Sequence, residues 1–122
     1  MSFTKLEEME VWQKGMGVAK AVYLATRNTS FDKDWGLRDQ IRRAAVSIPS
    51  NIAEGFERGS DGDFNRFLMI SKGSCGELRT QILLAQQIGY LDLTLSEPII
   101  KECLSISSMI AALSRHLKGK QS

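Results

Sequence analysis

Residues 40–55 read QIRRAAVSIPSNIAEG, and this stretch is the strongest indicator of the fold. Its apolar residues recur every three or four positions, which places them on one face of an α-helix. Pro49 disturbs that pattern, because proline lacks a backbone N–H and clashes with the carbonyl four residues earlier, at a cost of about 3 kcal/mol in a helix interior. The sequence therefore predicts a helix that is kinked or interrupted near Pro49, with one continuous, bent helix as the alternative.

Four segments of the chain have this helical spacing of apolar or small residues. The first predicted core row is Trp12, Met16, Ala19 and Tyr23, with Gly15, Val18 and Val22 beside it; the second is Leu37, Ile41, Ala44 or Ala45, Ile48, Ile52 and Phe56. The third row is Phe64, Leu68, Ser71, Cys75, Leu78, Ile82, Ala85 and Gly89, and the fourth is Ile99, Cys103, Ile106, Ile110, Leu113 and Leu117. No segment alternates with period two for long enough to indicate a strand.

Polar and glycine-containing segments separate the four predicted helices. Residues 28–36 form the longest of these connections, Ser60 followed by Asp63 indicates the start of the third helix, and Thr94 indicates the start of the fourth. Short connections make consecutive helices antiparallel neighbours. We therefore predict an all-α protein, an antiparallel up-down-up-down four-helix bundle, that forms a single domain over residues 1–122.

The charges of the chain nearly balance, with 16 lysines and arginines against 14 aspartates and glutamates. A protein that binds nucleic acid by charge alone is expected to be more basic. Cys75 and Cys103 both fall within predicted helices and no hydrophobic leader follows Met1, which favours a reduced, cytoplasmic setting. The uncharged runs are too short to span a bilayer, so we expect no membrane partner.

The sequence contains no constellation typical of catalysis or metal binding. His116 is the only histidine, and with two cysteines in separate helices it does not make a metal site. We expect no enzyme activity, no cofactor, no metal and no small-molecule substrate. An enzymatic interpretation would need a deep pocket that brings together several of four polar residues. These are Tyr23, Arg43, Asn51 and Glu54.

The third predicted helix carries more apolar residues than one bundle needs, because each helix hides only about a 100° sector. A second row consists of Phe67, Ile70, Ser74, Leu84 and Ile88, extended by Met69, Gly73, Gly76 and Leu83. Gly73 and Gly76 each cost about 1 kcal/mol relative to alanine in a helix interior. They predict a close approach by another subunit, and simple tolerance of two helix glycines is the alternative.

Polar residues of the second helix and several arginines are the candidate functional residues. Asn51 lies near the apolar row and needs a hydrogen-bond partner, such as the carbonyl that Pro49 leaves free. The predicted residues of an oligomer interface or structural motif are Arg43, Ser47, Pro49, Asn51, Glu54, Gly55, Gly73 and Gly76. The predicted RNA contacts are Arg38, Arg42, Arg58, Arg66 and Arg79, because the guanidinium fork suits phosphate. A solvated face with weak ion pairs is the alternative for Arg38, Arg42 and Arg43.

Residues 41–55, supported by FNRFL at residues 64–68 and by Gly73-Ser74, resemble the 23S rRNA intervening-sequence protein family. The similarity extends over residues 12–117. It implies a bacterial four-helix bundle that assembles as a homopentamer, and an association with RNA because family members are often encoded within rRNA intervening sequences. A related branch is the accessory protein of diversity-generating retroelements, whose basic pentamer binds nucleic acid and a reverse transcriptase.

These observations lead to two expected functions. The first is a non-enzymatic homo-oligomeric scaffold that binds RNA or an RNA-handling protein through arginines gathered by symmetry. The alternative is a pure protein-assembly module without nucleic-acid binding. The balanced charge favours assembly as the role of Arg43, Asn51 and Glu54, and leaves three arginines facing RNA: Arg38, Arg42 and Arg58.

Overall fold

A computed structural model describes residues 5–121, so residues 1–4 and 122 of the predicted domain lie outside the described part. Four α-helices make up most of this part: α1 (Glu10–Ala25), α2 (Trp35–Glu57), α3 (Asp61–Gln87) and α4 (Leu93–Gln121). Two short 3-10 helices, η1 (Leu6–Glu8) and η2 (Thr29–Phe31), precede α1 and α2. The described residues contain no strand, which confirms the all-α class.

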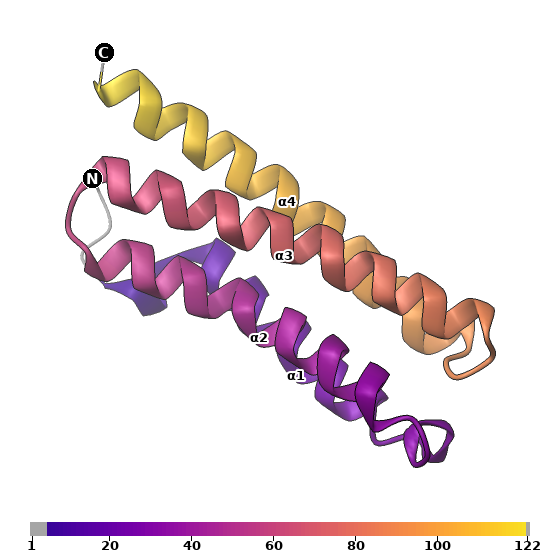
Figure 1. Cartoon of the computed structure of the whole chain (residues 1–122). Helices are drawn as coiled ribbons and strands as arrows, with labels where there is room; N and C mark the ends of the chain where they lie inside the picture. Colours follow the sequence, from indigo (N-terminus) through magenta and orange to yellow (C-terminus); the bar gives the residue numbers. More distant parts are fainter. Residues whose placement is uncertain (1–4, 122) are drawn as a thin grey trace.

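The helices lie side by side along their lengths (Figure 1). Helix α3 packs between α2 and α4, and α1 packs on α2 and α4. The connections from α1 to α2 and from α3 to α4 lie at one end of the molecule, and the connection from α2 to α3 lies at the other (Figure 1). No helix within residues 5–121 is long and apolar enough to cross a membrane.

The core contains the rows predicted for α2, α3 and α4 with one exception: Gly89 lies after the end of α3 and is exposed. Its fully buried members from these helices include Ile41, Ile48, Ile52, Leu68, Leu78, Ile82, Ile106 and Ile110. Each row keeps the alternating spacing of four and three residues that holds one helix face against its neighbours. The long repeats in the sequence therefore identify the inner faces of these three helices.

The prediction for α1 is wrong at Met16 and Tyr23, which are 48% and 43% exposed, whereas Gly15, Val18 and Val22, predicted beside that row, are buried. The buried row consists of Val11, Gly15, Val18, Val22 and Ala25. Both rows have helical spacing, and packing on α2 decides between them. A β-carbon on Gly15 would lie only 3.3 Å from Pro49 Cβ, so the smaller residues let α1 approach α2 closely.

Helix α2 runs without a break through Pro49. The predicted interruption is therefore wrong, because α2 is one continuous helix, and the kink near Pro49 stays a prediction. Pro49 itself is buried, and Ser71 Oγ from α3 donates a hydrogen bond of 2.9 Å to the Ile48 carbonyl beside it. The proline thus lies at a contact of three helices, where α1 and α3 both pack on α2.

The helix ends follow from local hydrogen bonds. Ser60 Oγ accepts a bond of 3.2 Å from the Asp63 N–H at the start of α3, as the sequence predicts. At the start of α4, Asp92 rather than Thr94 is the cap, because Asp92 Oδ1 accepts bonds from Thr94 Oγ1 at 2.6 Å and from the Leu95 N–H at 3.1 Å. These two bonds, that of Thr94 first, lower the pKa of the Asp92 carboxyl.

Candidate functional site

The polar side chains around Pro49 bond within the bundle. Asn51 Nδ2 donates to the Ser47 carbonyl at 2.8 Å, and Ser47 Oγ donates to the Ala44 carbonyl at 3.0 Å. Ser47 Oγ also makes a hydrogen bond with Ser74 Oγ of α3. The partner of Asn51 is thus the Ser47 carbonyl, and not the Ala45 carbonyl that Pro49 leaves without its helical donor. Ser47 and Asn51 both contribute to the local structure of α2 and its contact with α3.

Gly55 lies at a close contact between α2 and α3. A β-carbon at this position would lie 2.8 Å from Phe67 Cβ and 3.2 Å from Phe64 Cα. Real β-carbons do not approach other carbons at 2.8 Å, because such a contact is deep within the repulsive part of the van der Waals potential. Gly55 is therefore explained by packing within one chain.

Gly73 and Gly76 differ from Gly55, because a β-carbon on either would meet no atom within 4 Å. The exposed apolar side chains of α3 and its C-cap are Met69 (39% exposed), Ile70 (45%), Leu83 (37%), Leu84 (46%) and the C-cap Ile88 (49%). We call these five residues with Gly73 and Gly76 the outer face of α3. Most of the second apolar row predicted for this helix lies here, although Phe67 of that row is buried.

Arg58 and Arg66 lie at the end of the bundle where α2 connects to α3. Their guanidinium carbons lie 5.0 and 4.5 Å from the centre of the Phe67 ring. Arg58 Nε is 3.4 Å from Glu54 Oε2, and Arg66 Nη2 is 3.6 Å from Asp63 Oδ1. These two arginines, predicted to contact RNA, therefore have both an aromatic and an acidic neighbour in the chain.

Arg38 and Arg79 lie on different helices and have different surroundings. Arg38 Nε is 3.6 Å from Asp39 Oδ1, and this nitrogen is buried without a hydrogen bond among the described residues. Arg79 is exposed on α3 beside a small groove that Cys75 and Cys103 line. The structure does not bring Arg38 and Arg79 together into one basic patch.

The two cysteines are buried on the inner faces of α3 and α4. Burial raises the pKa of the Cys75 thiol to about 11 and, together with the neighbouring Cys75, that of the Cys103 thiol to about 12. The thiolate is the nucleophile and the metal ligand, so both thiols are unreactive at neutral pH. Within residues 5–121, no three histidine, cysteine or acidic side chains are grouped to hold a metal ion.

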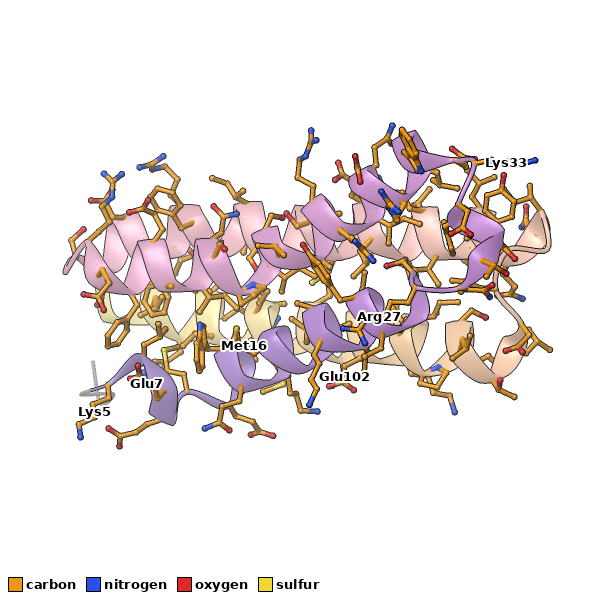
Figure 2. All side chains as sticks on the ribbon, turned by 90° about the horizontal axis from the view of Figure 1, so that it is seen from below. Lys5, Glu7, Met16, Arg27, Lys33 and Glu102 are labelled. Carbon is orange, nitrogen blue, oxygen red and sulfur yellow. The ribbon has the colours of Figure 1, made fainter. Side chains whose placement is uncertain are left out.

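Helices α1 and α2 border an open groove of about 520 Å³, which we call the α1–α2 groove. Its lining residues are Tyr23, Asp39, Arg42, Arg43, Val46 and Ser47. The Arg42 guanidinium carbon lies 4.6 Å from the centre of the Tyr23 ring, and Arg42 Nε donates a hydrogen bond of 2.8 Å to Thr26 Oγ1. Figure 2 shows α1 and α2 side by side along this part of the bundle.

Arg43 is exposed between two grooves. It lines the α1–α2 groove and also a polar groove of about 420 Å³ between α2 and α3, with Gln40, Glu77 and Gln81. Among the described residues, Arg43 has no ion pair, hydrogen bond or ring contact, unlike Arg42. Its guanidinium is therefore available to a molecule outside the chain.

The sequence does not identify Tyr23 as a surface residue, because its spacing also fits the core row of α1. The signal for exposure is the presence of Lys20 and Arg27 three and four positions away, since such residues share a helix face. Arg27 lies just beyond the end of α1, after the C-cap Thr26 (Figure 2). Of the four residues whose convergence would indicate an enzyme, Tyr23 and Arg43 share a groove, whereas Asn51 and Glu54 do not line it.

A continuous four-helix core and an exposed apolar helix face define a helical-bundle protein with an apolar surface on α3. The family model of the 23S rRNA-intervening sequence protein matches residues 7–112, so the chain belongs to this family. A solved structure from Bacteroides thetaiotaomicron, a protein with unknown function from the S23 ribosomal protein family, has the same fold. It superposes with a TM-score of 0.77 at 24% identity, over 85% of this chain and 97% of that one. Among curated proteins, no sequence matches the chain.

Proposed function

We propose that this protein is a non-enzymatic, cytoplasmic homo-oligomer of antiparallel up-down-up-down bundles that associates with RNA. The observation that carries the proposal is the outer face of α3, where exposed apolar side chains surround two glycines with open space above them. In a single chain those glycines only weaken the helix, by about 1 kcal/mol each. Close packing of a second chain against this part of α3 explains why positions 73 and 76 are glycines.

A second copy of the chain is the partner that best fits this face. Ile70, Leu84 and Ile88 are each nearly half exposed, and exposed apolar patches of this kind are typical of protein interfaces. The face also carries few charges that would oppose a second copy, since Glu77 is the acidic residue between Gly73 and Leu83 and Arg79 the basic one. A homopentamer is the stoichiometry that the family resemblance implies.

Association with RNA is supported by the family description and by the arginines. The name of the family refers to an intervening sequence of 23S rRNA. One chain has a net charge of only +2, which alone binds RNA weakly. Several copies related by symmetry repeat Arg42 and Arg43 around one assembly, and repeated weak contacts add up to a high avidity.

A protein-assembly module without nucleic-acid binding is the second candidate. The balanced charge favours it, and so do the acidic neighbours of Arg58 and Arg66. The Arg43→Ala variant separates the two candidates. A smaller particle with unchanged RNA binding per chain assigns Arg43 to assembly, and an intact particle with weaker RNA binding assigns it to RNA.

Assembly is tested by the mass in solution of the wild type and of Gly73→Leu. We expect the wild type to be an oligomer and Gly73→Leu to be a folded monomer, because the new side chain occupies the space of the partner. Gly17→Leu is the matched control, since Gly17 is also an exposed helix glycine without a neighbour within 4 Å. A monomeric wild type contradicts the proposal, and so does an intact Gly73→Leu oligomer.

RNA association is tested by filter binding over a series of salt concentrations. We expect an affinity for RNA that falls steeply as salt rises, because phosphate contacts release counterions. If the wild type does not bind RNA even at low ionic strength, the assembly module without RNA is the remaining candidate.

A further inference from the structure

We infer that the α1–α2 groove binds one unstacked base of a single-stranded RNA, with the Tyr23–Arg42 pair as the platform for the base and Arg43 as the phosphate ligand. This inference rests on the proposed association with RNA. It specifies that the RNA is single-stranded and which residues bind it.

The platform is already ordered in the free protein. Arg42 lies over the Tyr23 ring at 4.6 Å, and its Nε is fixed by the 2.8 Å bond to Thr26 Oγ1. Thr26 is buried, and its hydroxyl donates a bond of 2.8 Å to the Val22 carbonyl. The guanidinium plane is thus anchored to the end of α1, while 43% of Tyr23 remains accessible. Aromatic rings and guanidinium planes are the surfaces on which proteins stack single-stranded bases.

The charge in the groove suits a phosphate. Arg43 has no partner among the described residues, so its positive charge is uncompensated within the chain. Asp39 is the one acidic residue of the lining, and Arg38 lies 3.6 Å from its carboxylate and offsets it. Arginine binds phosphate with two parallel N–H donors, and a base on Arg42 brings its own phosphate to the neighbouring position of α2.

The form of the groove favours a single strand over a duplex. Its volume of about 520 Å³ lies within the range of pockets that hold small molecules. The bases of a duplex are stacked on one another, so they present no free face to Tyr23. Helix α1 packs on α2 and α4, and the outer face of α3 is formed by a different helix of the bundle. The α1–α2 groove and the outer face of α3 are thus two separate surfaces of one chain, and each copy contributes one groove.

The platform is tested with a short single-stranded RNA that carries the fluorescent base 2-aminopurine. We expect wild-type protein to quench its fluorescence by stacking, Tyr23→Ala to bind about tenfold more weakly with most of the quenching lost, and Tyr23→Phe to retain both. Leu24→Ala is the matched control, because Leu24 is the adjacent exposed residue of α1 and lines no part of the groove. The same sequence in a duplex is expected to bind more weakly and to show no dependence on Tyr23.

The phosphate ligand is tested by the salt dependence of binding. Removal of one phosphate contact in Arg43→Ala is expected to reduce the slope of log affinity against log salt by about 1, whereas Tyr23→Ala leaves the slope unchanged. If Tyr23→Ala binds RNA with the same affinity as the wild type, the α1–α2 groove is not the binding site, and the proposed association with RNA still stands. Absence of wild-type binding at low salt overturns the proposed RNA association itself, and the groove with it.

Discussion

Helix glycines of this bundle occur in two different surroundings. At Gly15 and Gly55, atoms of a neighbouring helix occupy the space next to the missing side chain, at 3.3 and 2.8 Å from a β-carbon. At Gly73 and Gly76 that space is open. Because every helix glycine has a cost relative to alanine, the first pair is explained by contacts within one chain, whereas Gly73 and Gly76, like Gly17 of α1, are not. What distinguishes Gly73 and Gly76 is their place among the exposed apolar side chains of the outer face of α3. The comparison separates the inner contacts, which are complete, from the outer face of α3, which we assign to a second copy.

The largest effect is expected at Gly55, where a β-carbon would lie 2.8 Å from Phe67 Cβ. Gly55→Ala is expected to lower the free energy of unfolding by about 2 kcal/mol, because the new methyl group overlaps Phe67 and forces α2 and α3 apart. Urea unfolding followed by circular dichroism measures this change. Gly17→Ala serves as the control and is expected to keep or raise stability, since a β-carbon there meets no neighbour within 4 Å. Equal stability of both variants would remove the distinction between packed and open glycines.

A second prediction concerns Cys75 of α3 and Cys103 of α4, which are protonated because burial raises their pKa values from 9.0 to about 11 and about 12. Above pH 9 the unfolded thiols ionise while the native thiols do not, so the unfolded state binds fewer protons and stability falls as pH rises. The loss is about 1 kcal/mol per thiol by about pH 10, and the contribution is fully present below pH 9.

The measurement for the thiols compares unfolding of the wild type and of Cys75→Ala/Cys103→Ala between about pH 8 and 10. The wild type is expected to lose more stability over this interval than the variant, whose own loss comes from other groups. Parallel curves would show that the thiols are accessible to water in the native state.

The smallest effect is expected on the outer face of α3. In dilute solution, where single chains predominate, Gly73→Ala and Gly76→Ala are each expected to raise the free energy of unfolding by up to about 1 kcal/mol, because alanine favours the helix. In concentrated solution the same variants are expected to assemble more weakly than the wild type. A loss of stability in dilute solution would mean that the two glycines already have close neighbours within one chain.

The fold was largely predictable from the sequence, and the contacts that depend on two helices were not. Long rows of apolar residues identified the inner faces of α2, α3 and α4, because one row in each helix is more regular than any other. In α1, the row of Val18 and the row of Tyr23 have equal spacing, and the choice depends on how closely Gly15 approaches Pro49.

The same limit applies to the candidate site. The sequence indicated that glycines and arginines are candidate functional residues. It does not reveal that Phe67 fills the space beside Gly55. It also does not reveal that Arg42 has a partner in Tyr23 while Arg43 has none. Those distinctions depend on distances between helices, and helical spacing alone contains no such information.

The central claim is that the outer face of α3 joins copies of this chain, and sedimentation velocity of two leucine variants tests it most directly. Leu84 on α3 and Leu24 on α1 are similarly exposed, at 46% and 50%, so a charge at either position disturbs a single chain equally little. We predict that Leu84→Glu sediments as a monomer and that Leu24→Glu sediments as the wild-type oligomer. An intact Leu84→Glu oligomer, or a Leu24→Glu monomer, would contradict the claim.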